Sequence, residues 1–205
     1  MPPGIDFIYD LASPNAYLAD RAIRGIEERT DVKFNYIPCL LGGIFKTTGN
    51  QAPFMTFANV KGKMQYERVE MDRFVRKHGL TRFQLNPHFP VNSLLLMRGA
   101  AAAEIDGTHQ EYIRAGMVAM WEQGLKMDDP EVFTKAMSAA GLDGAHLLAR
   151  AHEPDAKQRL IDNTSAAVKR GVFGIPTFFV GDEMFFGKER LEQVEEAIRH
   201  SAERA

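Results

Sequence analysis

Apolar residues recur along the chain with two different spacings, and the spacing separates strands from helices. Residues 5–9, Ile-Asp-Phe-Ile-Tyr, predict a short buried strand, and residues 32–37 alternate as a second strand does. Between them, Ser13 stands where an N-cap belongs and Pro14 occupies the first helical position. The residues that follow at helical spacing are Ala19, Ala22, Ile23 and Ile26. Strand, helix and strand in this order predict a parallel βαβ unit.

The middle of the chain, from about residue 40 to residue 154, shows helical spacing without a strand of comparable quality. Residues 40–45 predict an apolar loop softened by two glycines. Gly79 and Gly141 suit the ends of two of the helices that the pattern predicts. The predicted helices span residues 63–78, 94–104, 110–122 and 130–140. We therefore expect an all-helical insertion over residues 40–154.

Strand patterns return near the C-terminus. A helix is predicted over residues 155–170, followed by strands 177–180 and 183–186, which a Gly181-Asp182 turn joins, and by a last helix over 189–204. Residues 1–39 and 155–205 together then form one α/β domain. The pattern predicts a thioredoxin-like fold interrupted by the helical insertion.

The composition and charge of the chain argue against several classes of function. The chain has 205 residues, a formal net charge of −2 and 45% hydrophobic residues, which suits one packed domain or one domain with a large insertion. The near-neutral net charge gives no sign of the excess positive charge that binds nucleic acid or an anionic membrane. No apolar run reaches the roughly 18 residues of a membrane span, the first residues lack a signal peptide pattern, and the histidines show no metal-ligand spacing. We expect a cytoplasmic protein without a metal.

The segment around Ser13 and the segment around Pro176 carry the chemistry. A thioredoxin-like fold brings such a helix start opposite such a proline loop, where a dithiol would normally stand. Here the helix start reads Ser13-Pro14-Asn15-Ala16, and the single cysteine is Cys39. A site without a dithiol needs a thiol from elsewhere, and glutathione is the obvious candidate. Ser13 is either an ordinary N-cap or a hydrogen-bond donor to a foreign thiolate at a helix N-terminus.

Four further positions have both a plain and a functional interpretation. Lys63 is either a solvated lysine or a partner for the glycine carboxylate of glutathione. Glu189, next to Lys188, either suits the first turn of the last helix or accepts the ammonium of the γ-glutamyl group. Asn50 is either a turn residue or a ligand contact. The Ile175-Pro176 bond is either an ordinary trans bond after a loop or a cis bond with the Ile175 backbone facing the ligand. Resemblance to thioredoxin-like folds, which hold a cis proline directly before a core strand, favours the cis form for Gly-Ile-Pro-Thr.

Together these segments resemble 2-hydroxychromene-2-carboxylate isomerases, which are glutathione-dependent relatives of kappa-class glutathione transferases and of DsbA-like oxidoreductases. The matching stretches lie around residues 6–19, 41–50, 86–90, 171–177 and 186–191. The resemblance implies a thioredoxin domain with a helical insertion, usually a homodimer, and glutathione bound between the two parts.

The resemblance also implies site residues and a reaction. Its catalytic serine falls on Ser13, its lysine on Lys63 with Tyr66, and its backbone contact on Ile175. Its Ser-Asp or Asn-Asp pair falls on Lys188-Glu189, which departs from that pattern. The implied reaction is the isomerisation of a small aromatic hemiketal acid. Two alternatives stay open: a kappa-like glutathione transferase or peroxidase, and a glutathione-binding scaffold without turnover.

Overall fold

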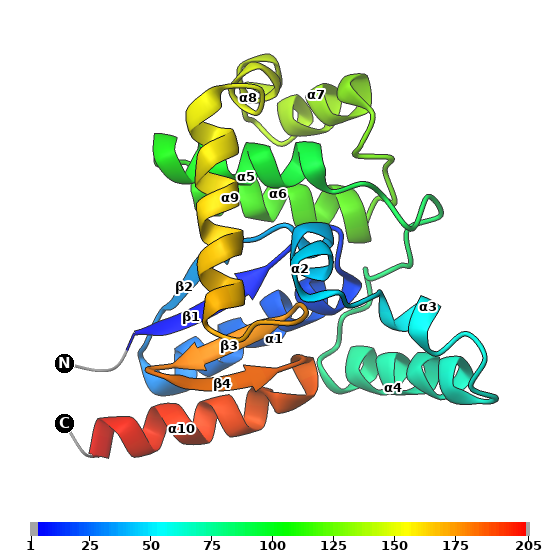
Figure 1. Cartoon of the computed structure of the whole chain (residues 1–205), viewed down its shortest axis with the longest axis vertical. Coiled ribbons are helices and arrows are strands. Elements are labelled where there is room, and N and C mark those ends of the chain that lie inside the picture. Colours follow the sequence, from blue (N-terminus) through cyan, green and yellow to red (C-terminus); the bar gives the residue numbers. More distant parts are fainter. Residues whose placement is uncertain (1–3, 204–205) are drawn as a thin grey trace.

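A mixed four-stranded sheet forms the centre of the molecule, for which a computed structural model describes residues 4–203 (Figure 1). Its strands lie in the order β2-β1-β3-β4, with β1 parallel to β2 and antiparallel to β3, and β3 antiparallel to β4. The strand bounds are Ile5–Tyr9 for β1, Phe34–Pro38 for β2, Thr177–Val180 for β3 and Glu183–Phe186 for β4. The predicted thioredoxin-like α/β fold with many added helices is confirmed.

Aromatic side chains of neighbouring strands form the centre of the core. Phe7 of β1 lies directly opposite Phe178 of β3, and the two buried rings stack with centroids 5.2 Å apart. Tyr36 of β2 meets the other side of Phe7 edge to face at 5.0 Å. Such cross-strand pairs fix the register, because a slip by one residue would turn each ring to the opposite face.

Helix α1, Pro14–Thr30, follows β1 and begins at Ser13, as predicted. The Ser13 side chain accepts a hydrogen bond from the Ala16 amide, and Asp31 ends the helix in the left-handed conformation. The C-terminal helix α10, Leu191–Glu203, packs against α1 and follows a short 3₁₀ turn over Lys188–Arg190. Arg204, the predicted end of this last helix, lies outside the described residues.

The insertion is helical, and most of its predicted helices are confirmed within a few residues. In Figure 1 the block of α5 to α9 lies on one side of the sheet and α10 on the other. The short helices α3 and α8 were not predicted. The bounds are Leu41–Thr48 for α2, Pro53–Thr56 for α3, Lys63–Lys77 for α4, Leu94–Asp106 for α5, His109–Trp121 for α6, Pro130–Ala139 for α7, Gly144–Arg150 for α8 and Pro154–Lys169 for α9.

The predicted loop over residues 40–45 is wrong, because Leu41 begins helix α2. Two distant side chains satisfy its first amides: the Thr164 hydroxyl accepts from Leu40, and the Asp10 carboxylate accepts from Leu41. Gly43 allows α2 to lie close to α9, since a Cβ there would come within 3.2 Å of Thr164 Cγ2. Tertiary contacts therefore outweigh the low helix propensity of the two glycines.

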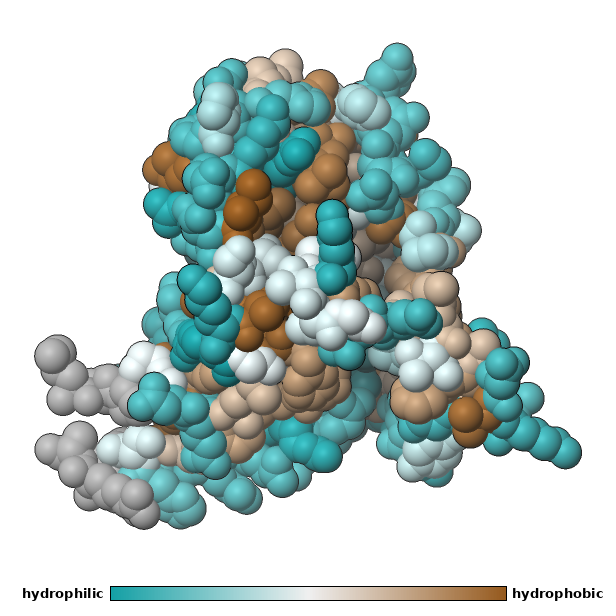
Figure 2. Space-filling model, viewed as in Figure 1, coloured by the Kyte–Doolittle hydropathy of each residue, from teal (hydrophilic) through white to brown (hydrophobic). Residues whose placement is uncertain are grey.

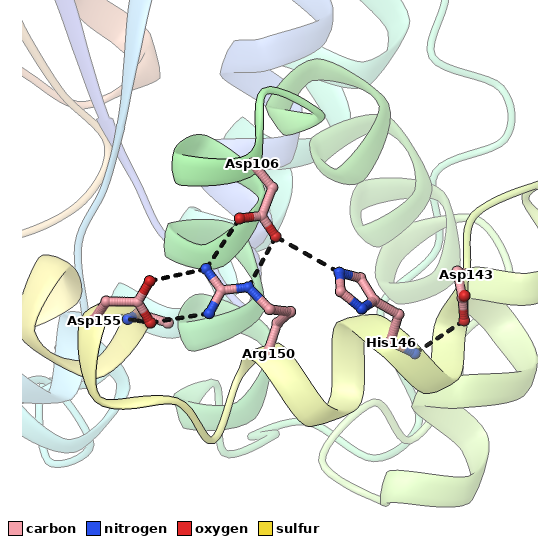
Figure 3. Close-up of polar contacts among 6 residues, drawn as sticks. Asp106, Asp143, His146, Arg150 and Asp155 are labelled. Carbon is pink, nitrogen blue, oxygen red and sulfur yellow. Dashed lines mark hydrogen bonds and ion pairs between the residues drawn. The ribbon is translucent and has the colours of Figure 1, made fainter.

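An ion-pair network joins the ends of three helices of the block (Figure 3). Arg150, at the end of α8, makes paired hydrogen bonds to Asp106 of α5 and to Asp155 of α9, all between 2.9 and 3.0 Å. The Nε2 atom of His146 lies 3.8 Å from Oδ2 of Asp106. Because α9 packs on α5 and also contacts β2, it connects the block with the sheet.

The division into residues 1–39 with 155–205 and residues 40–154 stays a prediction.

Helices α3 and α4 form an arm that extends from the body (Figure 1), and neither contains a buried residue. Hydrophobic side chains are nevertheless visible on the arm in Figure 2. The exposed large hydrophobic residues from α3 to the start of α4 are Phe54, Met55, Phe57, Val60 and Met64. Across residues 4–203, the helices are too short or too polar to span a membrane.

Candidate functional site

The strand registers bring the predicted site segments to one end of the sheet. Ile8 lies opposite Thr177, so the residues after β1 and the residues before β3 meet at the same edge of the sheet, the one formed by the ends of the strands. Thr177 also lies opposite Phe186, and just beyond that pair the Gly187 amide donates a 2.9 Å hydrogen bond to the Pro176 carbonyl. Three segments therefore share this edge: the turn that leads to Ser13, the proline loop, and the start of the last helix.

Ser13 is nearly buried, with 5% of its surface exposed. Its amide donates to the Asp10 carbonyl at 3.0 Å, and its Oγ accepts from the Ala16 amide at 3.2 Å. Within residues 4–203 no acceptor takes the Ser13 hydroxyl proton, so the hydroxyl can donate to a ligand. Asn15, in the same turn, has a buried Oδ1 without a hydrogen-bond partner among these residues. The first turn of α1 thus offers the free Ser13 hydroxyl proton beside the Asn15 amide, which has no hydrogen-bond partner among these residues, at the positive end of the helix dipole.

The Ile175-Pro176 peptide bond is cis, as predicted. In the described chain, the hydrogen bonds of the sheet and loops leave the Ile175 amide and carbonyl without a backbone partner. Two half-exposed rings border this loop, Phe173 and Phe186, whose centroids lie 4.5 Å apart. A free donor and acceptor on one residue is the arrangement that pairs with an extended peptide backbone.

Lys188 and Glu189 lie just beyond Gly187, next to the proline loop. Lys188 is 3% exposed, its ammonium pairs with the Glu189 carboxylate, and it lies 5.5 Å from the centroid of the Phe74 ring. A recess of about 150 Å³ opens beside this pair, between α4 and the 3₁₀ turn. Its lining carries charges of both signs and consists of Glu70, Arg73, Phe74, Lys77 and Glu189.

The contribution of the α4 face to this recess was missed by the sequence analysis. The Tyr66 hydroxyl and Arg73 hold the pKa of Glu70 below its usual range, with a smaller effect from the Lys188 ammonium. The sequence predicts a helix over residues 63–78, and the helix contains Phe74. Nothing in the spacing indicated that this turn of α4 would meet Lys188.

Lys63 and Asn50 are not joined to Ser13 by any hydrogen bond or ion pair in the part of the chain that the structure describes. The Lys63 ammonium pairs with Glu67 on the next turn of α4 and lies 5.5 Å from the Phe57 ring, both within the arm. Asn50 is exposed and follows Gly49, whose φ of 73° ends α2. The structure therefore brings Ser13, Ile175, Pro176, Lys188 and Glu189 to one edge. Lys63 and Asn50 lie on α4 and just after α2, and no hydrogen bond or ion pair within residues 4–203 joins either of them to these five residues.

Cys39 is fully buried at the end of β2, and burial raises the pKa of its thiol well above the ordinary value. A buried thiol of this kind is a poor nucleophile, because only the thiolate reacts. Residues 4–203 contain no group of three or more side chains arranged to hold a metal ion. The groups that this edge offers to a ligand are the Ser13 hydroxyl, the backbone of Ile175 and the charges around Lys188.

Comparison with known proteins shows the family of the chain. A model of the DsbA-like thioredoxin domain matches residues 4–199. The chain is 26% identical to a 2-hydroxychromene-2-carboxylate isomerase from Pseudomonas putida over 196 residues, which is 95% of this chain and 93% of that protein. It is also 26% identical to glutathione S-transferase kappa 1 from Rattus norvegicus, over 93% of this chain and 88% of that protein.

The similarity extends to solved structures. A structure of 2-hydroxychromene-2-carboxylate isomerase superimposes with a TM-score of 0.81 and 26% identity, over 98% of each chain. A probable DsbA oxidoreductase from Streptomyces coelicolor shares the fold with a TM-score of 0.71 at 15% identity, over 99% of this chain and 91% of that one. With its four-stranded sheet, its helical block and a family match over almost its whole length, the chain belongs to the DsbA-like thioredoxin domain family.

Proposed function

We propose that this protein is a glutathione-dependent isomerase of 2-hydroxychromene-2-carboxylate or a similar small aromatic hemiketal acid, in which Ser13 stabilises the glutathione thiolate. The observation that carries the proposal is the free hydroxyl proton of Ser13 at the N-terminus of α1, at the sheet edge shared with Ile175 and Pro176. The related isomerases and the related kappa transferases support the substrate class and the cofactor.

Each residue at the edge has a role that its contacts allow. The Ser13 hydroxyl and the Asn15 amide at the start of α1 favour a thiolate over a thiol, because both stabilise negative charge. The Ile175 amide and carbonyl bind the peptide backbone of the tripeptide as an added strand would. Glu189 receives its ammonium end. We assign the glycine carboxylate to Lys63, with Asn50 as a further contact from the arm.

When bound, glutathione supplies a thiolate that adds to a conjugated carbon of the substrate and leaves again after rotation about the resulting single bond. Addition and elimination need no second thiol, which fits a chain whose one cysteine is buried. Disulfide exchange, by contrast, requires an accessible resolving thiol. The contribution of the protein is a lowered thiol pKa and a fixed orientation of the reactants.

Mass spectrometry of glutathione before and after many turnovers with 2-hydroxychromene-2-carboxylate tests the reaction. The proposal expects product to form while free, reduced glutathione is recovered unchanged. Stoichiometric loss of glutathione to an adduct would identify a transferase, the activity in the name of the kappa relatives. Oxidised glutathione formed with a peroxide would identify a peroxidase. Tight binding without conversion of any substrate would identify a scaffold.

We also propose that the protein is a cytoplasmic homodimer. The cytoplasm keeps glutathione and protein thiols reduced, as this use of the cofactor requires. The exposed apolar side chains of α3 and the start of α4 give self-association a surface, since contiguous apolar patches commonly mark interfaces. Light scattering after size-exclusion chromatography tests this, and exchanging Met55 for lysine should produce a monomer if the arm forms the contact.

A further inference from the structure

Asp10 is a buried carboxylate at the end of β1, with 1% of its surface exposed. Its Oδ1 accepts a 2.9 Å hydrogen bond from the Ala12 amide, one residue before Ser13. Its Oδ2 accepts 2.9 Å from the Leu41 amide and 2.7 Å from the Ser93 hydroxyl. Its backbone carbonyl accepts from the Ser13 amide at 3.0 Å. One residue thus contacts the turn before α1, the first residue of α2 and the N-cap of α5.

These contacts place the starts of three helices around one carboxylate. Neither α2 nor α5 has a cap hydrogen bond from its own N-cap side chain, so Asp10 supplies to α2 what a local cap would supply. Burial raises the pKa of Asp10, and the hydrogen bonds from Leu41, Ala12 and Ser93 act in the opposite direction. A carboxylate that receives bonds on both oxygens holds its neighbours in fixed positions.

We propose that Asp10 is a positioning residue for Ser13, which makes the geometry of the reactive turn depend on the helical insertion through Leu41 and Ser93. The inference rests on the proposed function of Ser13 and deepens it. Asp10 has its contacts to the turn on one side and to the insertion on the other, so a displaced α2 or α5 displaces the turn. Asp10 itself need not touch glutathione.

The substitution Asp10→Asn tests this with almost no change in shape. An amide has one acceptor oxygen, whereas Ala12 and Leu41 donate to opposite oxygens of the carboxylate, so one backbone N–H is left facing an NH₂ group. We expect Asp10→Asn to raise the pKa of enzyme-bound glutathione by about one unit and to lower kcat/KM about tenfold. The pKa is read from the ultraviolet absorbance of the thiolate.

A double-mutant cycle with Ser13→Ala separates positioning from general effects. If Asp10 acts through Ser13, adding Asp10→Asn to Ser13→Ala should change neither the thiol pKa nor kcat/KM any further. A shift in thiol pKa that persists in the Ser13→Ala background would overturn the proposal, because it would show that Asp10 acts by its charge. If Ser13→Ala alone leaves the thiol pKa unchanged, the proposed function of Ser13 fails instead.

Two more variants control for loss of stability. Asp20→Asn removes another buried carboxylate, which accepts a 3.0 Å hydrogen bond from Tyr36 within the thioredoxin part and does not touch the reactive turn. It should lower the melting temperature without moving the thiol pKa. Ser93→Ala removes one contact of Asp10 and keeps its charge, so it should shift the thiol pKa in the same direction as Asp10→Asn. An unchanged thiol pKa in both Asp10→Asn and Ser93→Ala would refute the inference.

Discussion

The indole N–H of Trp121 donates a 2.8 Å hydrogen bond to the carbonyl oxygen of Leu11, two residues before Ser13. Trp121 is fully buried at the end of α6, so the insertion reaches directly under the turn that carries the candidate reactive group. The Leu11 amide donates a hydrogen bond to the sulfur of Met97 on α5, at 3.2 Å. The reactive turn is therefore shaped by residues about a hundred positions away in the chain.

The Trp121→Phe variant should lose roughly 1–3 kcal/mol of unfolding free energy, because the buried Leu11 carbonyl is left without a partner. Denaturant unfolding measures the loss. It is followed by circular dichroism, because Trp121 is the only tryptophan and the variant has no tryptophan fluorescence to follow. Tyr112→Phe is the comparison: it removes a buried 2.7 Å bond to the Leu96 carbonyl inside the block. Only Trp121→Phe should also shift the pKa of bound glutathione, and equal effects of both variants on that pKa would contradict the account.

Two glycine substitutions should change stability in opposite directions. At Gly99 of α5 a Cβ would come within 2.2 Å of the Tyr112 hydroxyl, so Gly99→Ala should destabilise the contact between α5 and α6 by about 1–3 kcal/mol. At Gly42 of α2 a Cβ meets nothing within 4 Å, so Gly42→Ala should stabilise by up to about 1 kcal/mol. Melting temperatures of the two variants, measured beside the wild type, provide the check, and a rise for Gly99→Ala would show that the two helices are not closely packed.

Local sequence pattern was sufficient for most of the fold. The strands 5–9, 177–180 and 183–186 were predicted with the bounds the structure shows, because short apolar runs between turn residues carry that information locally. Helix α2 was predicted as a loop, because the group that caps it is Asp10, 31 residues earlier. The short helices α3 and α8 offer too few residues for a periodic pattern.

The candidate site was predictable where it depends on strand order and not where it depends on how the arm is oriented. Ser13 and Ile175 meet because β1 and β3 are neighbours, which the thioredoxin-like pattern implies. The recess beside Glu189 requires that the last turns of α4 lie against the 3₁₀ turn, and no residue spacing encodes that packing. Lys63 stays an assignment made by resemblance, as its contacts lie within the arm.

His109, at the start of α6, should make stability depend on pH. Burial lowers the pKa of His109 from 6.5 to about 4, and its Nε2 lies 2.9 Å from the Tyr9 hydroxyl. The unfolded chain therefore binds a proton that the folded chain does not, so this contribution is complete above pH 6.5 and is lost as the pH falls towards 4. The loss has an upper limit of about 3 kcal/mol.

His109→Gln should flatten this acid slope of the unfolding free energy, measured by urea titration between pH 4 and pH 7. His152→Gln provides the control, because His152 is exposed to solvent. An equally steep slope in wild type and His109→Gln would show that His109 takes up its proton without unfolding.

Glu189→Gln should weaken glutathione binding roughly tenfold, equivalent to about 1.4 kcal/mol, because the amide no longer attracts the ammonium of the γ-glutamyl group. The buried Lys188 ammonium also loses its carboxylate partner. Calorimetric titration with glutathione measures the affinity. Glu192→Gln, which removes an exposed carboxylate in the first turn of the last helix that pairs with Lys77, should bind as the wild type does. Equal affinities in wild type and Glu189→Gln would remove Glu189 from the site.

Titration of thiolate absorbance in Ser13→Ala shows whether Ser13 stabilises the thiolate of bound glutathione. Losing a hydrogen bond to a charged group costs about 1.5–3 kcal/mol, which corresponds to a rise in the thiol pKa of roughly one to two units. Ser201→Ala, which removes a hydroxyl near the end of α10, should titrate as the wild type does. A raised thiol pKa with glutathione still bound is the predicted result, and the same thiol pKa in Ser13→Ala and wild type would contradict the account.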